Sequence, residues 1–231
     1  MKEQIYTIPV TETVDRINEN GECTCLLCSL YKKLEDDELN LILGASMMEP
    51  DIRIKTNKEG FCRKHFDMML TMKNKLGLAL MLQSHIDEVR NTVFPKEGLF
   101  SPKNKCDASL KPLEEHTKSC YICGKVDFHL GKMAETIVYL WEHEEEFAKK
   151  FSKMPYFCVE HYRLLLQTGV YKLPKNKQND FYTAVSSIQK AYINSLYDDV
   201  SWFCKKFDYR FEDEPWGNSK DSCERAVKFL S

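Results

Sequence analysis

The feature that most constrains this chain is a set of cysteine and histidine motifs that occurs twice. Each copy begins with Cys-x-x-Cys and continues, after a long segment, to Cys-x-x-His. The first cysteine of the pair precedes the later cysteine by 37 residues in one copy and by 38 in the other. The surroundings match too: Phe61-Cys62-Arg63-Lys64-His65-Phe66 corresponds to Phe157-Cys158-Val159-Glu160-His161-Tyr162. Spacing and context together indicate an internal duplication.

Four soft donors in each copy are the ligand set that structural zinc prefers. A Cys-x-x-Cys turn brings two sulfurs to one ion. A Cys-x-x-His at a helix start supplies the other two donors, because residues i and i+3 share a helix face. We therefore predict two structural zinc ions and group their donors by copy, although the sequence leaves open whether each ion is bound within one copy or between the copies. The predicted ligands are Cys25, Cys28, Cys62 and His65 for one ion, and Cys120, Cys123, Cys158 and His161 for the other.

Other roles for these cysteines are less favoured. An iron–sulfur cluster also takes thiolates and is the less favoured occupant. Thioredoxin-like chemistry uses Cys-x-x-Cys beside a βαβ pattern, which this sequence lacks. Cys23 offers a third thiol near the first pair. Aligning the two copies matches Cys25 to Cys120 and leaves Cys23 without a counterpart in the second copy, so the repeat selects Cys25. Cys23 therefore stays a candidate for a separate reactive thiol.

The apolar residues recur with helical periodicity, so we predict an all-α, duplicated helical repeat. A Cys-x-x-His opens a helix in each copy, and the clearest amphipathic helix runs from Phe181 to Phe207. The run from Leu76 to Leu82 is apolar nearly all round, which predicts deep burial. A short helix from Ser222 to Leu230 ends the chain.

The repeat also predicts the domain organisation. The first metal-binding repeat spans 1–95, and the second spans 119–207. A linker at 96–118 contains Pro102 and Pro112 and separates the copies. Residues 208–231 form a C-terminal turn and the short helix.

Bulk properties indicate a globular protein of the cytoplasm. The chain has 231 residues, of which 43% are hydrophobic. The N-terminus has no apolar signal-peptide run, and no stretch approaches about 18 consecutive apolar residues, so no membrane span is expected. Ten cysteines in a reducing compartment favour metal binding over disulfides.

Charge and motif content disfavour two further functions. A net charge of −2 gives no basic excess for nucleic-acid binding. A closed four-ligand zinc site leaves no position for a catalytic water. His143-Glu144 resembles the start of a zincin motif, but Phe147 stands where the second histidine would be. We predict no catalytic residues.

Several segments outside the metal motifs carry a family resemblance. They are Met48-Glu49-Pro50-Asp51, Thr56-Asn57-Lys58, Gly60 to His65, Leu76 to Leu82, Phe207-Asp208-Tyr209-Arg210, and Pro215-Trp216 with Arg225-Ala226. With them, nearly the whole chain resembles an uncharacterised family of bacterial cytoplasmic proteins that are helical and rich in cysteine and histidine. The resemblance implies the scaffold and the eight Cys and His positions, and it implies no activity.

The sequence therefore favours a zinc-binding helical scaffold that binds a protein partner or a small ligand. One alternative is an enzyme or thiol-redox protein that uses Cys23 or an open metal site. A second alternative is a nucleic-acid-binding zinc protein. The partner and the oligomeric state stay open.

Overall fold

The computed structural model describes residues 4–94 and 102–231, and their regular structure is helical. No strand occurs in these two ranges; one isolated parallel bridge joins Cys25 and Tyr156. The predicted all-α class is confirmed. Residues 96–101 of the predicted linker lie outside the described residues.

The chain divides into two compact units. The first unit contains Met1–Lys32 and Leu130–Ser231, and the second contains Lys33–His129. The boundaries fall inside helices α2 (Leu26–Leu43) and α7 (Tyr121–His143), so each of these helices contributes residues to both units. This division differs from the predicted one at 1–95 and 119–207, because it follows contacts in space, whereas the repeat follows the order of the motifs.

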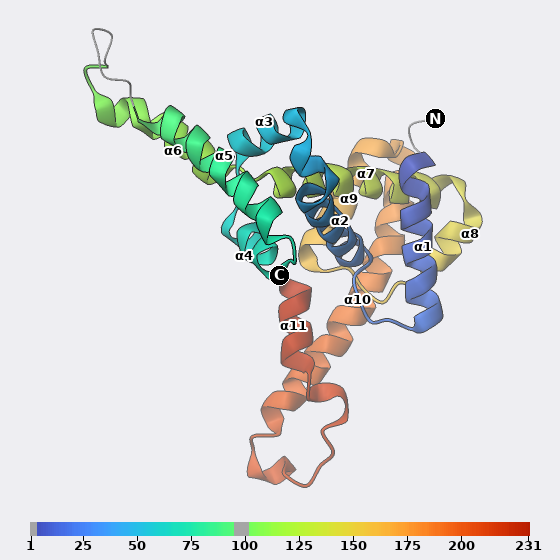
Figure 1. Ribbon diagram of the computed structural model, residues 1–231. Coiled ribbons are helices and arrows are strands. Elements are labelled where there is room, and N and C mark those ends of the chain that lie inside the picture. The colour runs from blue at the N-terminus through green and yellow to red at the C-terminus, as the bar shows by residue number, and fades with distance from the viewer. Residues whose placement is uncertain (1–3, 95–101) are drawn as a thin grey trace. The chain divides into compact units, whose positions relative to one another are not determined.

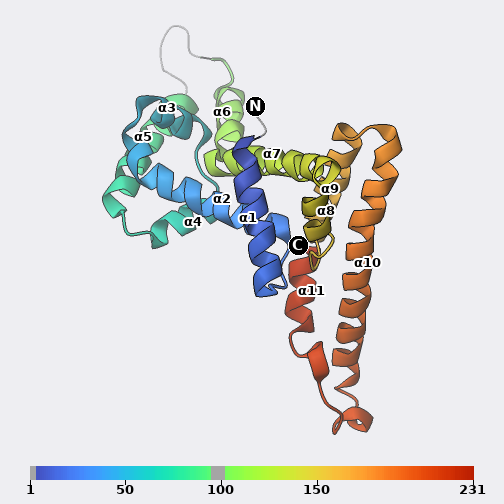
Figure 2. The ribbon, with the colours of Figure 1, turned by 90° about the vertical axis from the view of Figure 1, so that its right-hand side faces the viewer.

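The first unit is built on the start of α2, the greater part of α7, and the helices that come before and after them. In chain order the others are α1 (Gln4–Asn20), α8 (Glu145–Phe151), α9 (Val159–Lys172), α10 (Lys175–Lys205), η2 (Tyr209–Phe211), η3 (Gly217–Ser219) and α11 (Ser222–Leu230). Helix α1 packs on α8, and α10 packs on both α9 and α11 (Figure 2). Its core includes the stacked rings of Phe151 and Phe157 and the ring of Phe181, which packs edge-on against Trp141.

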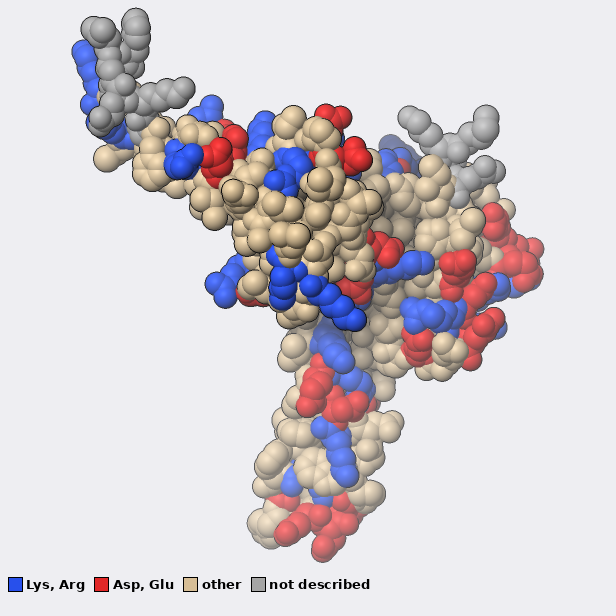
Figure 3. Space-filling view, in the orientation of Figure 1, with Lys and Arg blue, Asp and Glu red and all other residues tan. Residues whose placement is uncertain are grey.

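The long helix α10 begins at Lys175, six residues before the predicted start at Phe181, and α11 has the predicted bounds. The burial of α10 ends at Leu196, and Phe207 lies beyond the helix with 76% of its surface exposed. Basic and acidic side chains lie next to one another over α10 and α11 (Figure 3). Arg225 of α11, for example, pairs with Asp199 of α10 at 2.9 Å.

The second unit contains the rest of α2, the start of α7 and the helices between them. These are η1 (Ala45–Met48), α3 (Pro50–Glu59), α4 (Arg63–Thr71), α5 (Lys75–Val93) and α6 (Lys105–Lys118). Helix α5 packs on both α3 and α6 (Figure 1). Helix α3 starts with Pro50 in its first turn, where the missing N–H costs nothing, and ends at Gly60.

One expectation is corrected in the second unit, and the segment predicted as a linker contains helix α6, which includes Pro112. The run from Leu76 to Leu82 is not deeply buried all round: Gly77, Leu78 and Met81 are buried, but Leu76 is 70% exposed. Helix α5 therefore packs through one face, as an ordinary amphipathic helix does.

Candidate metal centres

The eight predicted donors come together in two groups of four. The first quartet is Cys25, Cys28, Cys158 and His161, and the second quartet is Cys62, His65, Cys120 and Cys123. Within each quartet the four ligand atoms lie within 4.8 Å of one another. Each quartet lies inside one compact unit, the first quartet in the first unit and the second in the second.

The predicted grouping within each copy is wrong. The Cys-x-x-Cys of one copy meets the Cys-x-x-His of the other, so Cys25 and Cys28 face Cys158 and His161 rather than Cys62 and His65. Backbone contacts inside each unit give a physical reason. Cys25 bridges to Tyr156, near Cys158. Tyr121 donates its N–H to the carbonyl of Gly60, near Cys62.

The local structure is the same at all four motifs. Cys25 and Cys120 directly precede α2 and α7, and Cys62 and Cys158 are the N-caps of α4 and α9. Both N-caps have extended backbone, with φ and ψ of −71° and 163° at Cys62 and −63° and 161° at Cys158. The second donor of each motif sits in the first helical turn. Every quartet is therefore built from two helix N-termini.

Short backbone contacts hold the two motifs of each quartet together. In the first unit Cys25 forms its parallel bridge with Tyr156, two residues before Cys158. In the second unit Tyr121 donates its N–H to Gly60 O at 3.0 Å, two residues before Cys62. Gly60 has φ +61°, and a Cβ there would meet the His85 ring at 2.9 Å, so glycine is needed at this position.

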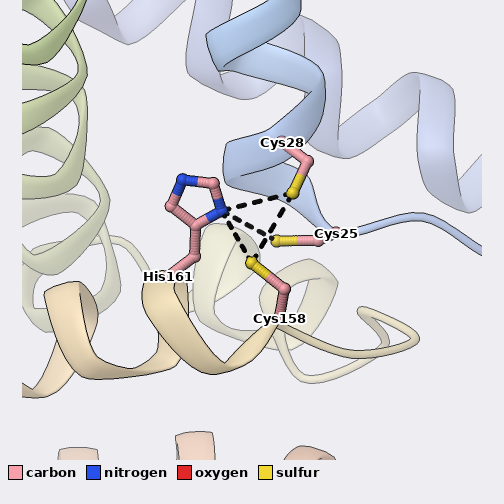
Figure 4. Close-up of side chains that lie close together, drawn as sticks. All are labelled: Cys25, Cys28, Cys158 and His161. Carbon is pink, nitrogen blue, oxygen red and sulfur yellow. Dashed lines mark hydrogen bonds between the residues drawn. The ribbon is translucent and has the colours of Figure 1, made fainter. Parts of the chain in front are cut away.

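Donor distances in the first quartet are short and similar. Figure 4 shows the sulfurs of Cys25, Cys28 and Cys158 converging with Nδ1 of His161. That nitrogen lies 3.6, 3.3 and 3.1 Å from the three sulfurs in the same order. The sulfurs of Cys28 and Cys158 are 3.6 Å apart.

The second quartet has the same arrangement. Nδ1 of His65 lies 3.2 Å from the sulfurs of Cys62 and Cys120 and 3.5 Å from that of Cys123. The sulfurs of Cys62 and Cys123 are 3.8 Å apart. Both histidines thus present the same ring nitrogen to three thiols.

These distances fit a tetrahedral zinc ion. With Zn–S near 2.3 Å and Zn–N near 2.0–2.1 Å, tetrahedral geometry requires about 3.8 Å between sulfurs and about 3.5 Å between sulfur and nitrogen. A disulfide would need an S–S length of about 2.05 Å, and all ten cysteines are free. The quartets have the size and the donor types of a closed zinc site.

Electrostatics also favour a bound cation. Interactions with Cys158 and Cys25, together with burial, raise the pKa of the Cys28 thiol, whereas hydrogen bonds from Cys25 and Cys28 lower the pKa of Cys158. In the second quartet, burial and then Cys120 raise the pKa of Cys123 to about 12. Burial acts against ionisation of Cys62 as well, but the hydrogen bonds from the backbone of His65 and from its neighbouring thiols leave the pKa of Cys62 lowered. A divalent ion would offset the effects that oppose ionisation of Cys28 and Cys123.

The helix N-termini add to this effect. Three thiolates, one neutral imidazole and Zn²⁺ carry a net charge near −1. The positive ends of two helices face each quartet, and a helix N-terminus stabilises a nearby negative charge by about 0.3–1 kcal/mol.

The two histidines differ in their outer contacts. His65 is fully buried, and its Nε2 lies 3.1 Å from Oε1 of Glu35, a carboxylate on α2 that is also buried. Burial alone would raise the pKa of Glu35, but the hydrogen bond and charge of Lys64, followed by those of His65, lower it. Glu35 therefore stays ionised at neutral pH.

Sequence reasoning missed Glu35. The signal was available, because Glu35 lies between Tyr31 and Leu39 on the helical stripe that faces the core. A charged residue on an apolar stripe requires a partner when it is buried. The partners, Lys64 and His65, are distant in sequence and become visible only in the fold.

The remaining candidates lie away from the quartets. Cys23 is exposed and belongs to neither quartet. His85 is half-buried and its Nδ1 lies 2.9 Å from Asn57 O. His143 stacks on the Tyr139 ring, with 4.3 Å between centroids. These histidines have the local contacts of structural side chains.

Fold and sites together define a class: an all-helical protein with two Cys₃His candidate metal centres, each assembled from both halves of a duplication. Compared with known families, residues 1–231 match the family described as a family of unknown function (DUF6062), and the chain belongs to it. The expected kinship with a family that has no assigned activity is confirmed. No curated protein and no solved structure matches the chain. None of the helices in the part of the chain that the structure describes combines the length and apolar character needed to span a membrane.

Proposed function

We propose that the protein binds two zinc ions, one in each quartet, and that the ions have a structural role. The observation that carries this proposal is the convergence of three sulfurs and one imidazole nitrogen, twice, within 4.8 Å. Four protein donors complete the coordination of zinc, which is typical of structural sites and not of catalytic ones. Thiolate and imidazole donors together favour zinc over calcium or magnesium.

A structural ion at each quartet would join helix N-termini that lie far apart in the sequence. In the first quartet the ion would connect the start of α2 to the start of α9, and in the second it would connect α4 to α7. Binding of this kind contributes directly to folding, by about 10–16 kcal/mol in small zinc modules. The resulting rigid helical scaffold would serve to bind a protein partner or a small ligand, in a reducing compartment such as the cytoplasm.

Elemental analysis of the purified full chain tests the proposal, with Cys25→Ser and Cys23→Ser as a matched pair. Cys25 is buried in the first quartet, whereas Cys23 is exposed and outside it. We expect two zinc ions per chain in the wild type and in Cys23→Ser, and one in Cys25→Ser. A site filled at a thousand times its Kd contributes about 4 kcal/mol, so the Tm of Cys25→Ser should fall by about 8–16 °C.

Three results would contradict the proposal. A folded wild type without metal would remove it. Iron with visible absorbance would replace zinc by an iron–sulfur cluster. A rapidly reacting Cys23 thiol in the zinc-loaded protein would favour the thiol-redox alternative.

A further inference from the structure

One acidic side chain of the second unit is buried against a proposed zinc ligand. Glu35 is 2% exposed, and its Oε1 accepts a hydrogen bond from Nε2 of His65, which is 0% exposed. Lys64 pairs with the same oxygen of Glu35 from the more exposed side. The imidazole of His65 is thus held at both nitrogens, by a carboxylate at one and by three thiols at the other.

This contact determines which nitrogen of His65 carries the proton. An ionised carboxylate only accepts hydrogen bonds, so Nε2 must be the protonated nitrogen. Nδ1 then presents its lone pair to the sulfurs of Cys62, Cys120 and Cys123. The ring is fixed in the tautomer and orientation that a metal ion at this quartet requires.

The sequence repeat shows that this arrangement belongs to one quartet only. Glu35 lies seven residues after Cys28, and the residue seven after Cys123 is Leu130. Lys64 corresponds to Glu160, which pairs with Arg163 instead. Both the carboxylate and its cationic partner are therefore replaced in the other copy, and His161 contacts its three cysteines through Nδ1.

We propose that Glu35 is a positioning residue for the second quartet, which fixes the tautomer and orientation of His65 and so slows the release of zinc from that site. The inference rests on the proposed function, because it assumes that the second quartet binds zinc. Partners of this kind around metal-bound histidines change metal affinity by about 10–100-fold. The effect is confined to the second quartet.

The test compares Glu35→Gln with Asp37→Asn in the full chain loaded with two zinc ions. Asp37 lies on the same helix and is exposed, so Asp37→Asn makes the same charge change away from His65. Zinc transfer to a chromogenic chelator gives a release rate for each ion. We expect one of the two ions to leave Glu35→Gln about 10–100 times faster, the other to be unchanged, and Asp37→Asn to match the wild type.

A long-range ¹H–¹⁵N spectrum of the histidine rings identifies the site and excludes a merely structural role. We expect the Nε2–H signal of His65 to move upfield and to exchange faster with water in Glu35→Gln, with the His161 signals unchanged. If Glu35→Gln does not fold, Glu35→Leu replaces it; leucine stands at the corresponding position of the other copy, and Lys64 is exposed enough to turn to solvent.

The outcomes separate the two proposals. Unchanged release rates and an unchanged His65 signal would overturn the role of Glu35 while leaving zinc binding intact. Equal acceleration of both ions would show a general loss of stability and would also overturn it. A wild type that takes up no zinc would remove the proposed function itself.

Discussion

His161 and His65 have equivalent places in the repeat but opposite acid–base behaviour. Burial acts to lower the pKa of His161, but hydrogen bonds and charge from Cys158 and Cys25 outweigh it and raise the pKa to about 9. For His65, burial outweighs the favourable effect of Glu35, and the pKa is lowered. In the absence of zinc, the ring of His161 is therefore protonated at neutral pH and the ring of His65 is neutral.

This difference predicts the pH dependence of zinc binding. Below pH 9, zinc must displace a proton from the ring of His161 but none from the ring of His65. The ring of His161 should therefore add up to about one proton per zinc ion to the release from the first quartet, and this contribution weakens zinc affinity by up to about tenfold per pH unit as pH falls from 9 to 7. Calorimetry in buffers of different ionisation enthalpy measures this, with Cys62→Ser leaving the first quartet and Cys28→Ser leaving the second. Equal proton release at both sites would contradict the assignment.

At the scale of the helices, each quartet combines the Cys-x-x-Cys of one copy with the Cys-x-x-His of the other. This crosswise grouping and a grouping within each copy predict opposite results for two double variants. Cys28 and Cys158 share one proposed ion, whereas Cys28 and Cys62 belong to different ions. We expect the Cys28→Ser/Cys158→Ser double variant to keep one zinc ion and the Cys28→Ser/Cys62→Ser double variant to keep none. Elemental analysis of refolded protein reads this directly. The opposite pair of results would restore the grouping within each copy.

These elements also show how far the sequence determines the site. Local periodicity predicts that α4 and α9 start at the Cys-x-x-His motifs. It also predicts the bounds of α11. The pairing of motifs was not predictable, because the two Cys-x-x-Cys units are chemically interchangeable. Pairing Cys28 with Cys158 closes a loop of 130 residues, and pairing Cys28 with Cys62 would close one of 34. The conformational entropy lost on closing the longer loop costs only about 1 kcal/mol more. Such a difference is too small to decide against tertiary packing.

The contact between α9 and α10 supplies a prediction about packing. A Cβ on Gly169 would lie 2.7 Å from Cδ1 of Phe181, whose ring is buried and cannot move aside. Gly169→Ala should therefore lower the free energy of unfolding by about 1–3 kcal/mol. Gly131→Ala on α7 is the control, because a Cβ there meets nothing within 4 Å, and it should stabilise the helix by about 0.5–1 kcal/mol. Urea unfolding compares the two; a Gly169→Ala variant as stable as the wild type would show that this helix contact is looser than described.

At the scale of the whole molecule, each compact unit contains one complete quartet, and the second unit is a continuous piece of the chain whereas the first is not. The first unit is formed from both ends of the chain, so its helices α9 and α10 depend on a partner motif at Cys25 and Cys28, far away in sequence. Loss of one ion should thus loosen the unit that surrounds it. It should not loosen the sequence repeat to which the mutated cysteine belongs.

Cys158→Ser and Cys62→Ser distinguish these cases by hydrogen exchange. With the first quartet broken by Cys158→Ser, amide protection should fall in 1–32 and 130–231, including α1 and the start of α2, which belong to the other copy. With Cys62→Ser, the loss should concentrate in 33–129 and include the start of α7. Peptide-resolved mass spectrometry of each variant against the zinc-loaded wild type measures the pattern, with Cys23→Ser as the control. Protection that falls across 119–207 alone in Cys158→Ser would mean that the repeats, and not the two units, are the structures that zinc holds together.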